Sequence, residues 1–342
     1  MDQLTKKIIL ILRRHGRISF SDIARELGVT RDQVASRVNP LFESSELRVI
    51  AAPHPRVLGL TVSAHISIKV SGDIQPIIQQ LNSLDSLVFI SVSAGAYQII
   101  AETGLPSMGD LRQQISMIRG IEGVSDVQVL LYERLLSSFF LGEEPESFNY
   151  DFDEYDTKII SILQKDGRAS YADIADQVGL SLSGCRIRVQ RLLDSGVMQI
   201  GAIKQRSDMT DDLLFGIGIN AHGDLQEVTA LLRAESGLEF MARTVGRYDI
   251  IATLSFNSLR DFNRLIARIV AMPSVTYSEQ WLHVQIVRER YDRPLGQLNI
   301  KSHDGGAARP LDKAATPVPI APTPALASQP VVSSTDRKKR RA

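Results

Sequence analysis

The sequence predicts an α+β protein made of two repeats, each a helix-turn-helix (winged-helix-like) domain followed by a ferredoxin-like βαββαβ domain. Three observations predict this fold: an internal repeat, helix signals that open each copy, and strand–helix alternation after them. A shift of 151 residues lays Lys7–Ser44 over Lys158–Ser195 without a gap. More than a third of the aligned positions are identical, against roughly 6% expected by chance from average composition. The repeat therefore indicates a duplication.

Composition is typical of a globular protein with a core in each half. The chain has 342 residues, 44% of them hydrophobic, and its charges balance to zero. This balance argues against a wholesale polyanion binder but is compatible with a local basic surface. The single cysteine, Cys185, excludes an intrachain disulfide and a thiolate metal cluster. No apolar run reaches about 18 residues, the length needed to span a membrane, and the N-terminus lacks a signal-peptide core. We therefore expect a cytoplasmic protein without a membrane partner.

The first helix-turn-helix domain is expected over residues 1–52. Residues 4–13 have helical apolar spacing, and Ser19 with Asp22 matches a capping box for a second helix. That helix should end at Gly28, because glycine is favoured just beyond a helix C-terminus.

The third helix of this domain should begin after the capping box formed by Thr30 and Gln33. Its inward face is expected to carry Val34, Val38 and Leu41. Proline lacks the backbone donor and disfavours helix at the preceding residue, so Pro40 predicts that this helix bends or ends early.

The two βαββαβ domains are expected over residues 56–135 and 211–290, with an acidic linker at 142–154 between the halves. The second helix-turn-helix domain occupies 155–204. Parallel strands need long crossovers, which the intervening helices provide. Expected strands are 57–70, 87–94, 97–103, 124–133, 213–221, 238–246, 248–255 and 275–287; expected helices are 73–83, 108–119, 224–235 and 259–271. Residues 302–342 are rich in proline and end in RKKRRA, a composition typical of disorder.

The third helix of each copy carries side chains suited to DNA. In a helix-turn-helix this helix presents its side chains to the major groove. Arginines bind guanine or phosphate, and serines at a helix N-terminus can donate to phosphate. The candidates in the second copy are Ser181, Ser183, Arg186, Arg188 and Arg191; those in the first are Arg31, Gln33, Ser36 and Arg37. The alternative is a solvated helix face. The two copies differ most on this outward face, so two DNA-binding copies should prefer different half-sites.

Both halves resemble the Lrp/AsnC (feast/famine) family of transcriptional regulators. The resemblance rests on GRASYADIADQVGLS with RVQRLLDSGVM, which is similar to the family's helix-turn-helix, and on GRYDIIATL in the second βαββαβ domain. It covers about residues 2–135 and 153–290. It implies a winged or extended helix-turn-helix joined to an ACT-like domain, assembly into oligomers, and a response to amino acids. Ordinary members have half this length, so the chain resembles a covalently joined dimer.

The resemblance also implies a ligand segment at Gly246, Arg247, Tyr248 and Asp249. A carboxylate such as Asp249 can hold an ammonium group, and glycine lets the backbone approach a ligand. The alternative is a hairpin turn whose aspartate caps a backbone amide. Gln98 replaces the aspartate in the first copy, so a charged amino-acid site is not expected there.

Other residues of chemical interest have simpler interpretations. Cys185 aligns with the core position Val34, which favours a buried hydrophobe over a redox thiol. Trp281 is expected to pack rather than to bind a ligand. The RKKRRA end is either a solvated tail or a nonspecific phosphate attractor. The histidines lack metal-ligand spacing, and no catalytic motif is present, so no metal, catalytic residue or cofactor is expected beyond an amino-acid effector.

We therefore expect a sequence-specific transcriptional regulator that binds double-stranded DNA and a small effector. Its expected assembly is a dimer to tetramer of double-length chains. The alternative is a metabolite-binding interaction protein in which one or both DNA-binding domains are inactive, as Asp32 and Pro40 in the first copy would allow. An enzyme is the least favoured reading, because no acid–base or nucleophile cluster is visible.

Overall fold

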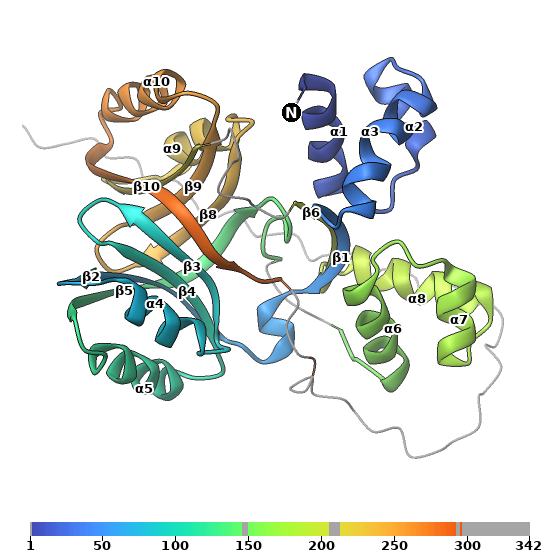
Figure 1. Cartoon of the computed structure of the whole chain (residues 1–342), viewed down its shortest axis with the longest axis horizontal. Helices are drawn as coiled ribbons and strands as arrows, with labels where there is room; N and C mark the ends of the chain where they lie inside the picture. Colours follow the sequence, from blue (N-terminus) through green and yellow to red (C-terminus); the bar gives the residue numbers. More distant parts are fainter. Residues whose placement is uncertain (1, 146–149, 205–212, 292–294, 296–342) are drawn as a thin grey trace, which may run out of the picture. The chain divides into compact units, whose positions relative to one another are not determined.

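The computed structural model describes residues 2–145, 150–204, 213–291 and 295, and it has the predicted α+β architecture (Figure 1). The predicted linker at 142–154 is therefore described only in part, and the predicted tail at 302–342 lies outside the described residues. The same order of elements occurs twice: three helices and a short strand, then a βαββαβ unit.

The first head consists of α1 (Gln3–Arg14), α2 (Phe20–Leu27), α3 (Arg31–Glu43) and β1 (Leu47–Pro53). The predicted caps are confirmed: Ser19 accepts a hydrogen bond from the Asp22 amide, and Thr30 and Gln33 form a capping box. Of the two outcomes predicted for Pro40, a bend or an early end, the early end does not occur, because α3 continues through Pro40 to Glu43. Burial of Val34 and Val38 in the head core favours the continuous helix over the local preference of proline.

The second head repeats this arrangement with α6 (Glu154–Lys165), α7 (Tyr171–Val178), α8 (Leu182–Asp194) and β6 (Met198–Lys204). Glycine in the left-handed conformation ends α2 at Gly28 and α7 at Gly179. Cys185 is fully buried in the head core, which matches its interpretation as a small hydrophobe.

The two heads share one hydrophobic core, which the sequence did not predict. β1 pairs antiparallel with β6 from the other half, from Leu47↔Lys204 to Pro53↔Met198. Arg17 donates to the carbonyls of Gly167 and Ala169, at 2.7 and 2.8 Å. Arg168 returns the interaction by donating to the carbonyl of Gly16 at 2.8 Å. The heads are therefore joined by reciprocal contacts that repeat at the 151-residue offset.

The two βαββαβ units close into one eight-stranded barrel of order β10-β3-β4-β2-β5-β8-β9-β7. Pairing of β5 with β8 and of β10 with β3 joins the halves. The helices α4 and α5 lie outside the first four strands, and α9 and α10 lie outside the second four (Figure 1). The bounds are β2 (Val62–Val70), α4 (Gln75–Asn82), β3 (Leu87–Ala94), β4 (Ile99–Leu105), α5 (Met108–Arg119), β5 (Val124–Ser138), β7 (Leu213–Ala221), α9 (Gln226–Arg233), β8 (Leu238–Val245), β9 (Ile250–Phe256), α10 (Leu259–Val270) and β10 (Val275–Glu289).

Three strands begin later than predicted: β4 and β9 by two residues each, and β2 by five. The strand expected from residue 57 starts at Val62, because Pro55–Leu58 forms a short 3-10 helix, η1, that ends at Gly59 in the left-handed conformation. Proline at the first position of η1 fixes its φ near the helical value, which favours a turn over an extended strand. The apolar Val57 and Leu58 had made this segment look like the start of the strand.

Aromatic and histidine side chains fill the inside of the barrel. Trp281 is 8% exposed and donates from Nε1 to His283 Nε2 at 3.1 Å. His283 Nδ1 lies 2.7 Å from the Ser91 hydroxyl. Because Nε2 accepts from Trp281, the proton of a neutral His283 ring lies on Nδ1, which can donate to Ser91. Gly216 makes room for the indole, since a Cβ there would lie 1.9 Å from Trp281. Trp281 therefore packs, as expected.

Candidate nucleic-acid interface and ligand site

The outward face of α8 carries an arginine flanked by apolar side chains. Arg186 is exposed, and Leu182 and Ile187 are 57% and 67% exposed. The buried Cys185, Val189 and Leu192 hold the opposite face of the helix in the core. The helix is thus anchored on one side and free to contact a groove on the other.

The predicted serines lie at the N-terminus of α8. Ser181 is its N-cap and accepts from the Gly184 amide at 3.1 Å. Ser183 is exposed, and its hydroxyl lies 3.2 Å from that of Ser181. The positive end of a helix dipole and exposed hydroxyls suit a phosphate oxygen.

Arg188 is engaged within the head instead of pointing to solvent. Its guanidinium pairs with Asp153 at 2.8 Å and with the buried Asp156 at 2.9 Å, and it lies over the Tyr155 ring. Burial is the largest single influence on the pKa of Arg188, and it lowers that pKa. The two carboxylates together outweigh burial, so the pKa is raised. Arg191 is exposed, with its guanidinium 4.9 Å from the centre of the Tyr150 ring.

The corresponding side chains of the first head are partly occupied. Arg37, the counterpart of Arg188, lies 3.6 Å from Asp2 and donates to the Gln33 carbonyl. The exposed Arg31 lies 3.9 Å from Asp32. Gln33 is used in the capping box of α3, and the exposed Ser36 donates to the Gln33 carbonyl. The first head therefore presents less uncompensated positive charge than the second.

The predicted ligand segment forms a tight turn between β8 and β9, and its polar side chains bind residues of neighbouring strands. One Asp249 carboxylate oxygen accepts from the Ala221 amide at 3.0 Å. Arg247 forms an ion pair with Glu279, which also accepts from the Tyr248 hydroxyl at 2.6 Å. These contacts correspond to the alternative of an aspartate that caps a backbone amide. Burial and Glu279 raise the pKa of Tyr248, so the phenol stays neutral.

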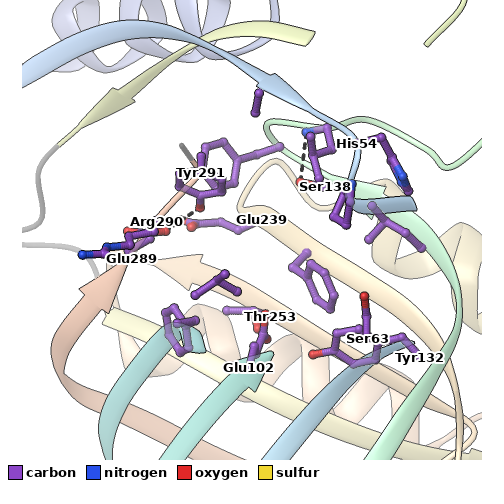
Figure 2. A pocket seen from close by; sticks show the side chains of 18 of the residues that line it. His54, Ser63, Glu102, Tyr132, Ser138, Glu239, Thr253, Glu289, Arg290 and Tyr291 are labelled. Atoms are coloured by element: carbon purple, nitrogen blue, oxygen red, sulfur yellow. Dashed lines mark hydrogen bonds between the residues drawn. The ribbon is translucent and has the colours of Figure 1, made fainter. Parts of the chain in front are cut away.

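A cavity of about 150 Å³ lies at one end of the barrel, and sequence reasoning missed it. Figure 2 shows Glu102, Glu239 and Thr253 around this space, with His54 and Tyr291 bordering it. The signal in the sequence was the presence of single acids inside otherwise apolar strands, as in IIAETGL around Glu102 and LEFMA around Glu239. We name this cavity the barrel mouth; it is lined by residues of all eight strands and by Ala52–Arg56.

Both heads match known helix-turn-helix families. Residues 1–41 match the AsnC-type helix-turn-helix domain, and residues 152–197 match the winged helix-turn-helix DNA-binding domain. An uncharacterized HTH-type transcriptional regulator of Pyrococcus horikoshii is 29% identical over 41% of this chain and 97% of its own. The proline dehydrogenase transcriptional activator of Rhizobium radiobacter is 26% identical over 41% of this chain and 93% of its own.

A solved structure is similar in fold to 84% of the chain. The siroheme decarboxylase NirDL has a TM-score of 0.58 over 84% of this chain and 93% of its own, at 16% identity. At this identity the likeness concerns the fold alone.

Two helix-turn-helix heads that share one core, joined to ferredoxin-like units, define a DNA-binding protein of the transcriptional-regulator class. More narrowly, the first head matches the AsnC type of helix-turn-helix, and about two fifths of the chain is similar to regulators of half its length. No helix within the described ranges is long and apolar enough to cross a membrane.

Proposed function

We propose that the protein is a sequence-specific regulator of transcription whose operator affinity responds to a small molecule bound by the barrel domains. The observation that carries the proposal is the outward face of α8, where exposed Arg186 lies beside exposed Leu182 and Ile187. Arginine reads guanine in the major groove, and apolar side chains contact the methyl group of thymine. The shared core of the heads supports a fixed spacing between the two reading helices.

Selection from a random DNA library, followed by a mobility-shift assay, tests this proposal. We expect Arg186→Ala to lower affinity for the selected site about tenfold or more, since one base contact contributes about 1–3 kcal/mol. Arg264→Ala is the matched control, because Arg264 is exposed on α10 of the barrel. Recovery of no enriched sequence, or unchanged affinity for Arg186→Ala, would contradict the proposal.

Arg188→Ala needs a separate interpretation, because this arginine neutralises the buried Asp156, which is 1% exposed. Its removal leaves a buried carboxylate without its ion pair, at a cost of about 3 kcal/mol. We therefore expect this variant to lose head stability, whereas Arg186→Ala keeps it. Urea unfolding of the two variants separates loss of base contact from loss of fold.

The second candidate function is a metabolite-binding interaction protein in which the first head does not bind DNA. It is favoured by Asp32, which lies 3.9 Å from Arg31 and offsets the charge of the first reading helix. A selected site that spans only one half-site, together with no effect of Arg31→Ala on affinity, would favour an inactive first head.

We propose that the protein is not an enzyme, although the fold resembles that of a siroheme decarboxylase. A decarboxylase needs a site for a carboxylate, and the barrel mouth is lined by Glu102, Glu144, Glu239 and Glu289. Like charges within a cavity disfavour such a substrate. Release of carbon dioxide from siroheme by the purified protein would contradict this proposal.

A further inference from the structure

We propose that the barrel mouth is a binding site for a small organic amine with an apolar or aromatic body. This deepens the proposed function by naming the place and the chemistry of the effector, and it rests on that function only for the consequence of binding. The site differs from the predicted segment at residues 246–249, whose polar side chains are already bound by Ala221 and Glu279.

The barrel mouth has the shape and location of a ligand site. Closed eight-stranded barrels hold one small ligand, and barrel mouths are preferred binding places. The cavity measures about 150 Å³, a volume that holds a molecule of about the size of benzene. The segment Pro53–Arg56 covers it from the side of β1.

The charges that line the barrel mouth favour a cation. Among the described residues of the lining, four carry carboxylates and two, Arg56 and Arg290, carry guanidinium groups. Arg56 is already paired with Glu144, which also accepts from the Leu135 amide at 2.9 Å. Glu239 is 6% exposed, and the Arg13 guanidinium of α1 lies 3.7 Å from its carboxylate. A buried carboxylate is stabilised by an ammonium that donates charge-assisted hydrogen bonds.

The Tyr132 hydroxyl is a second polar group directed at this space. Its oxygen is buried and has no hydrogen bond of good geometry. Burial, and after it the nearby Glu102 carboxylate, raise the pKa of Tyr132 well above its usual value. The neutral phenol and the carboxylate together offer acceptors for the hydrogens of an ammonium group.

The rest of the lining suits an apolar body. Phe89, Phe139 and Phe240 contribute aromatic rings, and Tyr132 and Phe240 lie with their ring centres 5.3 Å apart. Aromatic faces attract cations and bury the hydrocarbon part of a ligand. A metal ion is not favoured, because the described residues contain no group of three or more side chains that could hold one.

Binding at this place would act on the first head through Arg13. The Arg13 guanidinium lies 4.5 Å from the centre of the Phe139 ring and 3.7 Å from Glu239, while its backbone belongs to α1. A ligand ammonium at Glu239 competes with Arg13 for the same carboxylate. The ligand thereby changes the attachment of α1 to the barrel. If the ligand binds one position of the head more tightly than another, binding shifts the head toward that position.

Calorimetric titration of the full chain with phenethylamine and, separately, with 3-phenylpropionate tests the site. The two probes share an aromatic body and differ in the sign of their charge. We expect the amine to bind and the carboxylate to give no heat. Glu102→Gln and Glu239→Gln should each weaken amine binding at least tenfold, whereas Glu227→Gln, at an exposed position of α9, should leave it unchanged.

Other outcomes would overturn the inference: no amine binding, equal or tighter binding of the carboxylate, or unchanged amine affinity in both glutamine variants. Asp249→Asn separates the two sites, because an amine that responds to this variant alone lies at the β8–β9 turn. If Glu239→Gln fails to fold, Thr253→Met fills the same cavity, and it should also abolish binding. Amine binding without any DNA binding would contradict the proposed function but would still support the barrel mouth as a ligand site.

Discussion

Among the residues of the two heads, the arginines shared by the copies bind within the protein, whereas two arginines found only in α8 are exposed. Arg17 and Arg168 join the heads, and Arg37 and Arg188 pair with the N-caps of α1 and α6. Arg186 and Arg191, which replace Ala35 and Pro40, are exposed. In the reading helices, the shared arginine therefore makes a structural contact, and the arginines that differ lie on the surface available for recognition.

His65 makes stability depend on pH. It is 2% exposed inside the barrel, and burial lowers its pKa to about 3. Between about pH 6.5 and 3 the unfolded chain binds a proton that the folded protein does not, so stability falls as pH falls, by up to roughly 1.4 kcal/mol per pH unit. We expect His65→Gln to reduce this slope in urea unfolding between pH 7 and pH 4.

The exposed His222 provides the control, because His222→Gln should leave the slope unchanged. Asp2, Asp22 and Asp153, whose pKa values are lowered, contribute a slope of the same sign at lower pH in every variant. An identical pH profile for His65→Gln and the unmodified protein would show that the histidine is not neutral when folded.

At the scale of elements, the β1–β6 ribbon and the paired turns after α1 and α6 make the two heads one unit. The Gly16 amide donates to the Ile200 carbonyl at 3.0 Å, and the Gly167 amide donates to the Val49 carbonyl at 2.8 Å. A Cβ on Gly167 would lie 2.9 Å from Val49 Cγ1, so the close approach needs glycine. The identical Gly-Arg pair in both copies thus has a physical cause.

Removing both crossing arginines should loosen the heads. We expect Arg17→Ala with Arg168→Ala to lower the free energy of unfolding by about 3 kcal/mol, because each guanidinium donates to backbone carbonyls of the other head. Urea unfolding followed by circular dichroism measures this. The control Arg25→Ala, at an arginine whose side chain is 78% exposed, should cost less than about 0.5 kcal/mol. Equal costs would contradict the assigned role.

At the scale of the whole molecule, the two halves of one chain together form the paired heads and the closed barrel. The two halves are similar but not identical in sequence. Both outer strands of each βαββαβ unit are used in closing the barrel, through β5–β8 and β10–β3. Assembly of further chains, which remains a prediction, would therefore use other surfaces than these strand edges. The unequal reading helices on a fixed frame favour an operator with two different half-sites.

Making the heads alike should make the operator symmetric. We expect a variant in which the outward residues of α3 are replaced by those of α8 to select an inverted repeat from random DNA, whereas the unmodified chain selects unlike half-sites. The changes are Arg31→Leu, Asp32→Ser, Gln33→Gly, Ala35→Arg, Ser36→Ile and Pro40→Arg. A palindromic site selected by the unmodified chain would contradict the inequality of the heads.

Local signals were sufficient to predict most elements and the outward face of α8. Caps such as Ser19 with Asp22 act over three residues, and apolar spacing reports one face of one helix, so both can be read along the chain. The early helix end predicted as one outcome of Pro40 does not occur, because packing of α3 against the head core outweighs a local preference.

From the sequence alone we predicted a duplication, the α+β order of elements, the two heads and their unequal reading helices. Only the tertiary structure decided that β1 pairs with β6, that eight strands close into a barrel, that Arg188 binds Asp156, and that Glu102 and Glu239 line one cavity. The reason is distance along the chain: Glu102 and Glu239 come from different halves, and strand pairing brings together residues whose local sequences carry no record of each other.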